Sequence, residues 1–135
     1  MWDRGYDQMV EAIKERFGFE LELYNTGGWC MVYQAQLEGN AVIWISDYDA
    51  GITPRIERLA LEGRGISVGW NVSIYRADSD GYPDNAIVAS AQHETALFAE
   101  LPGLIALALE SVATNAQHHF AKGGQHTVTH GVMEF

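Results

Sequence analysis

Lysine and arginine are missing from a third of this chain. Residues 77–121 contain neither, although the same stretch holds six carboxylates: Asp78, Asp80, Asp84, Glu94, Glu100 and Glu110. The whole chain carries 18 acidic against 8 basic residues, a formal net charge of −10. Such a charge repels nucleic acids and anionic membranes and attracts basic partners. We therefore expect no nucleic-acid or membrane partner.

Cysteine is almost absent too. The single Cys30 excludes an internal disulfide and a metal site built from several cysteines. No apolar run approaches the roughly 18 residues that a membrane-spanning helix needs, and residues 1–8 lack the basic-then-apolar layout of a signal peptide. With 135 residues, 47% of them hydrophobic, we expect one globular domain in the cytoplasm.

Hydrophobic periodicity predicts the secondary structure. Apolar residues recur at helical spacing in residues 6–17 and again from Pro102 onward, where a long helix should run to the glycine pair at 123–124. Alternation of apolar and polar residues predicts strands. The five strands expected in this way cover residues 19–23, 31–37, 41–46, 68–75 and 86–91.

The predicted fold class is α+β. An antiparallel sheet of about five strands should carry the N-terminal helix and the long C-terminal helix on one face, in the order α-β-β-β-(α)-β-β-α. The bracketed helix is a short one at residues 54–61, with Ile56, Leu59 and Ala60 turned inward. Residues 1–122 should form the single domain, and residues 123–135 a tail that is either mobile or a marginal strand.

Tryptophan is frequent for a chain of this length. Trp44 and Trp70 lie within apolar strands and are expected in the core. Trp29 lies next to the turn signal Asn25-Thr26-Gly27-Gly28 and could be an exposed anchor for a partner.

Histidine and cysteine supply few candidates for chemistry. Cys30 enters a strand with no helix start beside it, so nothing in the sequence lowers its pKa as a nucleophile needs. His118 and His119 are adjacent and point apart on the expected helix. His126 and His130 lie among strand-forming residues, which would hold them about 13 Å apart. We therefore expect no catalytic residue, metal or cofactor, and these four histidines are the remaining metal candidates.

Acidic turns offer one further motif. Asp78-Ser79-Asp80-Gly81 with Asp84 is similar to a calcium-binding loop, but it lacks the third spaced oxygen ligand and the closing glutamate. Asp47, Asp49 and Gly51 form a poorer version of the same cluster. Ordinary turns explain both segments.

One segment is charged in the opposite sense. Residues 51–76 contain Arg55, Arg58, Arg64 and Arg76 against Glu57 and Glu62, a local excess of +2. A basic patch on an acidic body is one way in which such a chain could associate with itself or orient a partner.

Two resemblances add to this interpretation. The segment NTGGWC at residues 25–30, preceded by FGFELELY and followed by Ile45-Ser46-Asp47, resembles small acidic uncharacterised proteins encoded by phages of actinobacteria, over about residues 1–112. That resemblance implies a phage protein, in the host cytoplasm, and assigns no catalytic residue. The predicted element order also looks like that of class I type III secretion chaperones, which are small acidic dimers that bind cargo.

The sequence favours a non-enzymatic, acidic protein-binding module, interpreted as a phage accessory or host-interaction protein. Its partner would be a basic surface on a host or phage protein. The candidate partner-binding residues are Glu20, Glu22, Asp78, Asp80, Asp84 and Trp29. Two alternatives stay open: a metal-dependent enzyme that uses the C-terminal histidines, and a chaperone-like homodimer.

Overall fold

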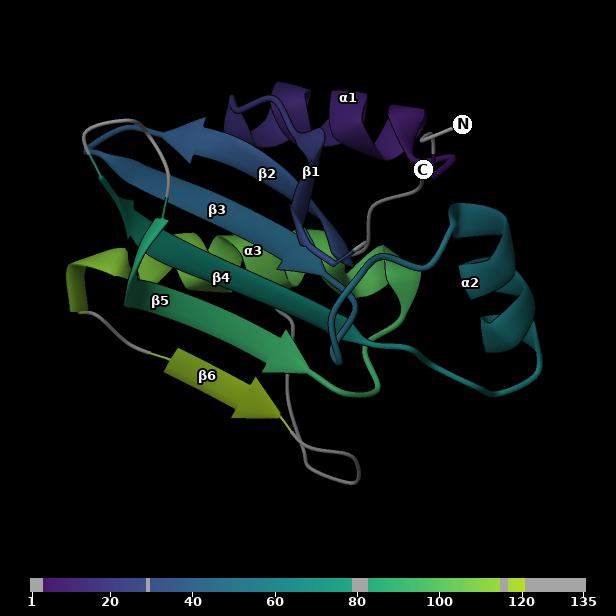
Figure 1. Ribbon diagram of the computed structural model, residues 1–135. Coiled ribbons are helices and arrows are strands. Elements are labelled where there is room, and N and C mark those ends of the chain that lie inside the picture. The colour runs from purple at the N-terminus through teal and green to yellow at the C-terminus, as the bar shows by residue number, and fades with distance from the viewer. Residues whose placement is uncertain (1–3, 29, 79–82, 115–116, 121–135) are drawn as a thin grey trace.

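The computed structural model describes residues 4–28, 30–78, 83–114 and 117–120. They form an α+β fold, and the element order confirms the predicted class (Figure 1). The helices are α1 (Asp7–Phe17), α2 (Arg55–Gly63), α3 (Leu101–Glu110) and the 3₁₀ turns η1 (Phe98–Glu100) and η2 (Val112–Thr114). The strands are β1 (Glu22–Gly27), β2 (Cys30–Leu37), β3 (Ala41–Ser46), β4 (Trp70–Ala77), β5 (Pro83–His93) and β6 (Gln117–Phe120).

All six strands belong to one sheet, in which they follow the order of the sequence. The first five are antiparallel neighbours, as the sequence predicted, although β1 begins at Glu22 and not at residue 19. The sixth, β6, lies parallel to β5 at the edge of the sheet. None of the helices that the structure describes is long and apolar enough to cross a membrane.

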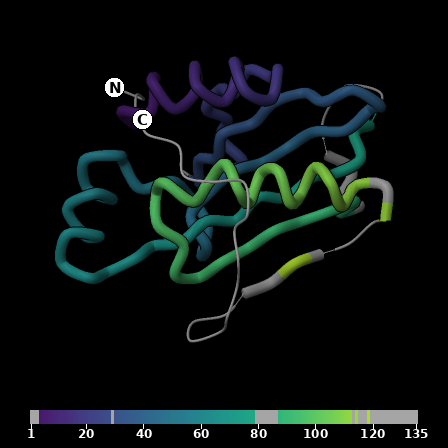
Figure 2. The backbone as a smooth tube through the Cα atoms, turned by 180° about the vertical axis from the view of Figure 1, so that it is seen from behind, coloured from purple at the N-terminus to yellow at the C-terminus, as the bar shows by residue number. Residues whose placement is uncertain are grey.

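The hydrophobic core lies between the sheet and two helices. Because side chains alternate along a strand, every second residue of β2 to β5 points to the same face. Residues of α1 and α3 pack on that face; when the molecule is seen from behind, α3 lies in front of the sheet and α1 runs above it (Figure 2). The buried contributions from the two helices are Met9, Ile13, Leu101, Leu104, Ile105 and Ala108, and those from the two central strands include Ile43, Ile45, Trp70, Val72 and Ile74.

The expected N-terminal helix is confirmed. Met9 and Ile13 are buried at helical spacing, and the helix ends where Gly18 adopts a left-handed conformation with φ of 84°. The Gly18 amide then donates a hydrogen bond to the Lys14 carbonyl at 2.9 Å. A glycine tolerates this conformation without strain, so the sequence signal and the observed end agree.

The expected long C-terminal helix is wrong in its extent. Pro102 does lie in its first turn, but α3 ends at Glu110 instead of continuing to residue 122. The Ser111 hydroxyl donates a hydrogen bond to the Leu107 carbonyl at 2.7 Å, and the following Val-Ala-Thr forms only a 3₁₀ turn. Serine and β-branched residues are poor helix formers, because the serine hydroxyl competes for backbone carbonyls. His118 and His119 consequently lie on β6 and not on a helix.

The second face of the sheet carries aromatic residues. Trp44 is only half-buried there, whereas Trp70 is fully buried in the core as expected. The Trp44 indole donates a hydrogen bond to Gln34 Oε1 at 2.6 Å, and its ring lies 5.3 Å from that of Tyr75. The prediction of a core position for Trp44 is therefore wrong, because its place in the strand alternation turns it away from the helices.

Gly69 allows two chain segments to meet just before β4. Its φ is 71°, and a β-carbon built on it would lie 2.5 Å from the Glu94 carbonyl oxygen and 2.6 Å from that of His93. Real β-carbons do not come this close to backbone atoms, so only glycine fits. The contact holds the segment before β4 against the segment after β5.

Replacement of Gly69 by alanine should therefore destabilise the protein strongly. Gly39→Ala is the matched control, because Gly39 has a similar φ of 78° and open space around its β-carbon position. Both variants incur the left-handed penalty of about 1–2 kcal/mol. We expect Gly69→Ala to lose about 1–3 kcal/mol more in urea unfolding, since backbone must move. Equal losses would contradict the close-approach argument.

Candidate functional site

Helix α2 is anchored by an arginine. Arg58 is its single buried residue and has no exposed surface, whereas Ile56 is 81% exposed and Leu59 is 37% exposed. Ala60 is exposed as well. The helix was correctly predicted, but the side expected to face the core was wrong. The Arg58 guanidinium has charged and polar partners in the interior, so Arg58 and not Ile56 is the buried side chain.

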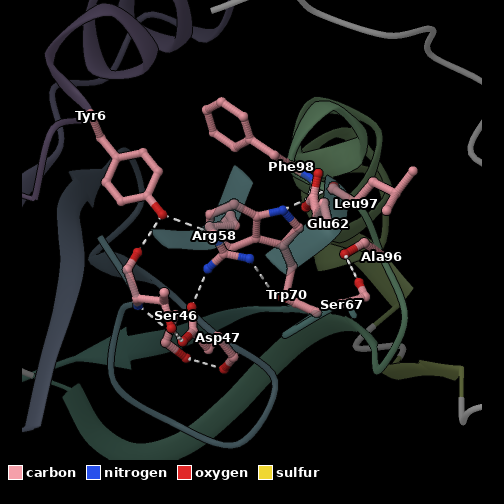
Figure 3. Close-up of polar contacts among 12 residues, drawn as sticks. Tyr6, Ser46, Asp47, Arg58, Glu62, Ser67, Trp70, Ala96, Leu97 and Phe98 are labelled. Carbon is pink, nitrogen blue, oxygen red and sulfur yellow. Dashed lines mark hydrogen bonds and ion pairs between the residues drawn. The ribbon is translucent and has the colours of Figure 1, made fainter. Parts of the chain in front are cut away.

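The guanidinium of Arg58 is bound on every side (Figure 3). Its Nη2 forms an ion pair with Asp47 Oδ1, its Nε donates to the Tyr6 hydroxyl at 2.8 Å, and its Nη1 donates to the Gly69 carbonyl at 2.9 Å. The cation also lies over the Trp70 ring, 3.7 Å from the ring centroid. A buried charge is tolerated only with such partners.

Asp47 is held as firmly as the arginine. Its Oδ2 accepts hydrogen bonds from the Thr53 amide at 2.9 Å and from the Thr53 hydroxyl at 2.5 Å. Burial raises the pKa of Asp47 above its ordinary value, and Arg58 and Thr53 oppose that shift. Burial likewise raises the pKa of Tyr6, whose hydroxyl donates to the Thr53 carbonyl. These groups have structural partners, and they fix the loop that follows β3.

Three loops meet at this end of the sheet and are braced against one another. The loop after β3 is joined to the segment before β4, where the Tyr48 amide donates to the Val68 carbonyl at 3.1 Å. The Ser67 hydroxyl donates to the Ala96 carbonyl at 2.8 Å, which links that segment to the loop after β5. The Trp70 indole donates to the Leu97 carbonyl at 3.1 Å. Loops fixed in this way form a preorganised surface.

Two adjoining hollows lie between these loops. The larger, of about 370 Å³, is lined by residues that include Glu62, Ile66 and Leu97. The smaller, of about 220 Å³, is lined by residues that include Asp49. They share Ser67 and Glu94 in their walls, so we treat them together as the end groove.

The end groove is acidic. Asp49, Glu62 and Glu94 line it together with Asp47, and no lysine, arginine or histidine occurs among its lining residues in the described chain. Glu62 Oε2 accepts a hydrogen bond from the Phe98 amide at 2.7 Å. Burial raises the pKa of Glu62, against the effects of that amide and of Arg58, and the charge of Glu100 adds to the increase.

The groove combines these carboxylates with apolar walls. Ile66 is 44% exposed and Leu97 is 48% exposed, although both are large apolar residues. A cation that enters beside Glu62 would favour the ionised carboxylate and so reverse the effect of burial on its pKa. The arrangement therefore suits a cationic group that has an apolar stem, as lysine and arginine side chains do.

Two of the carboxylates predicted from the sequence lie elsewhere. Glu20 and Glu22 line a separate hollow of about 340 Å³ near the edge strand β1. Glu20 also forms an exposed ion pair with Lys14 at 3.7 Å, a contact that contributes little to stability. This hollow holds no other acidic residue in the described chain.

Asp78 is far from the hollow near β1 and from the end groove. Glu22 on β1 pairs with Gln34 on β2. Gln34 in turn pairs with Trp44 on β3, and Trp44 pairs with Ser73 on β4, so these residues lie side by side across the sheet. Asp78 follows Ser73 by five residues, which places it roughly 16 Å further along the strands and roughly 14 Å across the sheet from Glu22. It lies beyond the end of β4 that is opposite to the end groove. Among the described residues, the structure does not bring Asp78 together with Glu20 and Glu22.

Three predicted residues cannot be placed in a site. Trp29 and Asp80 lie outside the described residues. Asp84 belongs to β5, but its side chain is not among those described.

Of the candidates for chemistry, the structure describes the side chains of Cys30 and His118, which lie on different strands. Cys30 is half-buried at the start of β2. His118 Nε2 lies 2.9 Å from the Ser111 hydroxyl, beyond the end of α3. The side chain of His119 is not described, and His126 and His130 lie outside the described residues. Within the described part of the chain, no three histidine, cysteine or acidic residues lie close enough together to hold a metal ion.

The sequence did not predict that the residues of the end groove form a site. Glu94 belongs to the stretch without lysine and arginine, and Asp49 to the poorer of the two acidic turns, so both had a weak signal. Glu62 lay in the segment with excess positive charge, and nothing in the sequence indicated a binding role for it. These three residues come from two loops and a helix, which no local pattern relates to one another.

The chain was compared with protein-family models, with curated proteins and with solved structures, and none of the three comparisons found a match. The end groove is therefore interpreted from its own residues.

Asp47→Asn should be strongly destabilising, because it leaves the buried Arg58 cation without its counter-charge. We expect a loss of about 3–5 kcal/mol in the free energy of unfolding, measured in urea. The double variant Asp47→Asn/Arg58→Met removes both charges and should lose much less than the two single variants summed. Additive losses would show that the two side chains do not interact as an ion pair.

Glu62→Gln should change how stability depends on pH. The raised pKa means that the folded protein holds this proton more tightly than the unfolded chain. Stability from this source is complete below the ordinary pKa of 4.5 and is lost as the pH rises through the higher value in the folded protein. The variant should lack this decline, measured by unfolding at a series of pH values. Glu57→Gln controls for the loss of one negative charge on α2, and a decline that persists in Glu62→Gln would contradict the assignment.

Proposed function

We propose that this protein is a non-enzymatic binding module that takes a basic segment of another protein into the end groove. The observation that carries the proposal is the composition of the groove: Asp49, Glu62 and Glu94 line two adjoining hollows, and none of the described lining residues is basic. Lysine and arginine side chains are the protein groups that complement such a surface. The resemblance to phage proteins is the ground for seeking this partner among host or phage proteins.

Two further features support this function. The loops are held by side chains and by the close approach at Gly69, so binding needs little rearrangement of the backbone. The net charge of −10 gives the whole molecule a long-range attraction for cations. That attraction would raise the association rate, and the local carboxylates would set the orientation.

The test is binding of a fluorescently labelled oligo-arginine peptide, measured by anisotropy at low and at moderate salt. Glu62→Gln/Glu94→Gln should weaken binding about three- to tenfold, since exposed ion pairs each contribute modestly. The matched control is Glu11→Gln/Glu15→Gln, which removes the same charge from exposed positions on α1. Equal weakening by both pairs would show that only the overall charge matters, and that result would contradict a groove-specific site.

A further inference from the structure

Exposed apolar side chains are concentrated around α2 and the end groove. The structure describes five large apolar residues as exposed, and four of them lie here: Ile56, Leu59, Ile66 and Leu97. The fifth, Val112, lies after α3. Isolated apolar residues on a surface are ordinary, but a group of them indicates an interaction surface.

Helix α2 presents its apolar residues outward because Arg58 anchors it from the inside. The helix stands beyond the end of the sheet in both views, away from the two covering helices (Figures 1 and 2). Ile56 and Leu59 are three residues apart, so they form one stripe on its exposed side. The small residues Ala60 and Gly63 flank this stripe, are also exposed, and would let another helix approach closely.

The stripe continues into the end groove. Leu59 and Glu62 are three residues apart and therefore neighbours on the helix surface. Glu62 lines the larger hollow together with Ile66 and Leu97. Ile56, Leu59, Ile66 and Leu97 thus form an apolar surface that runs from the outer side of α2 to the walls of the hollow. We call this surface the α2 stripe.

The charges around the α2 stripe select the partner. Glu57 is exposed on α2, and Glu62 and Glu94 lie in the hollow. Arg64 is the exposed base on this helix end. A second copy of this chain would bring these carboxylates against one another, with a net charge of −10 on each molecule. A segment with apolar residues on one side and lysine or arginine beside them matches both features.

We propose that the end groove and the α2 stripe together bind a basic amphipathic helix. The apolar side of that helix packs on Ile56, Leu59 and Leu97, while its cations reach Glu62 and Glu94. The inference rests on the proposed function and adds that the partner is a helix, recognised by its apolar stripe as well as by its charge.

Two labelled peptides of identical leucine and lysine composition separate this inference from simple charge attraction. One has leucine at positions i, i+3, i+4 and i+7, and the other has the same residues scrambled around the helix. Anisotropy titration should show the striped peptide binding at least about tenfold more tightly, because only it can bury its leucines on the α2 stripe. Ile56→Ser/Leu59→Ser should abolish this preference, and Val112→Ser, at the exposed apolar site outside the stripe, should retain it.

The outcomes distinguish the two proposals. If both peptides bind equally, and Glu62→Gln/Glu94→Gln still weakens binding, the helix inference is wrong and the proposed function stands. If neither peptide binds, the proposed function itself is wrong. A preference that survives Ile56→Ser/Leu59→Ser, or light scattering that shows a dimer abolished by the same variant, would overturn the inference as well. Circular dichroism of each variant confirms that it is folded.

Discussion

The buried ion pair between Arg58 and Asp47 is the constraint on which the rest of this structure depends. Arginine keeps its charge at any accessible pH, so the fully buried Arg58 needs charged and polar partners in the interior. Tyr6, Asp47 and Gly69 supply that match from the start of the chain, the loop after β3 and the segment before β4. One side chain therefore joins three segments that are distant in sequence. It also decides which side of α2 faces the solvent, and the exposed isoleucine on that helix follows from the buried arginine.

The same network gives the end groove its character. Hydrogen bonds donated by Ser67, Trp70 and Thr53 fix the loops, so the shape of the groove is set by the protein itself. Glu62 is exposed enough to meet a ligand and buried enough that its charge is costly. A cation bound beside it would relieve that cost, so the rigid scaffold holds a carboxylate in a state that favours cation binding.

Much of the fold could be predicted from the sequence, because α1 and the strands bury residues in regular patterns. Two of the errors came where a polar contact decided the structure. From periodicity alone, Ile56 was predicted to face inward, because nothing in the neighbouring sequence reveals that Arg58 has partners in distant segments. Periodicity also extended α3 too far, because the apolar pattern continued past Ser111, where side-chain hydrogen bonding ends the helix. The end groove was less predictable still, since Glu62 and Glu94 are 32 positions apart and line the same hollow only in the folded chain.

Charge counted along the chain differs from the charge that a partner would meet. Residues 51–76 carry a formal excess of +2, which would suggest a basic patch beside the groove. In the folded protein Arg58 is buried against Asp47, Arg55 lies over the Phe98 ring at 5.7 Å, and Arg76 is at the opposite end of the sheet. The charge of Arg58 is thus neutralised in the interior and that of Arg76 is displaced from the groove, while Arg64 stays exposed at the end of α2 and Glu62 lines the groove. Glu62 and Ile66 nevertheless give the groove an acidic and apolar wall from a segment that is basic in sequence, so the charge of the groove follows from the fold and not from the composition of the segment.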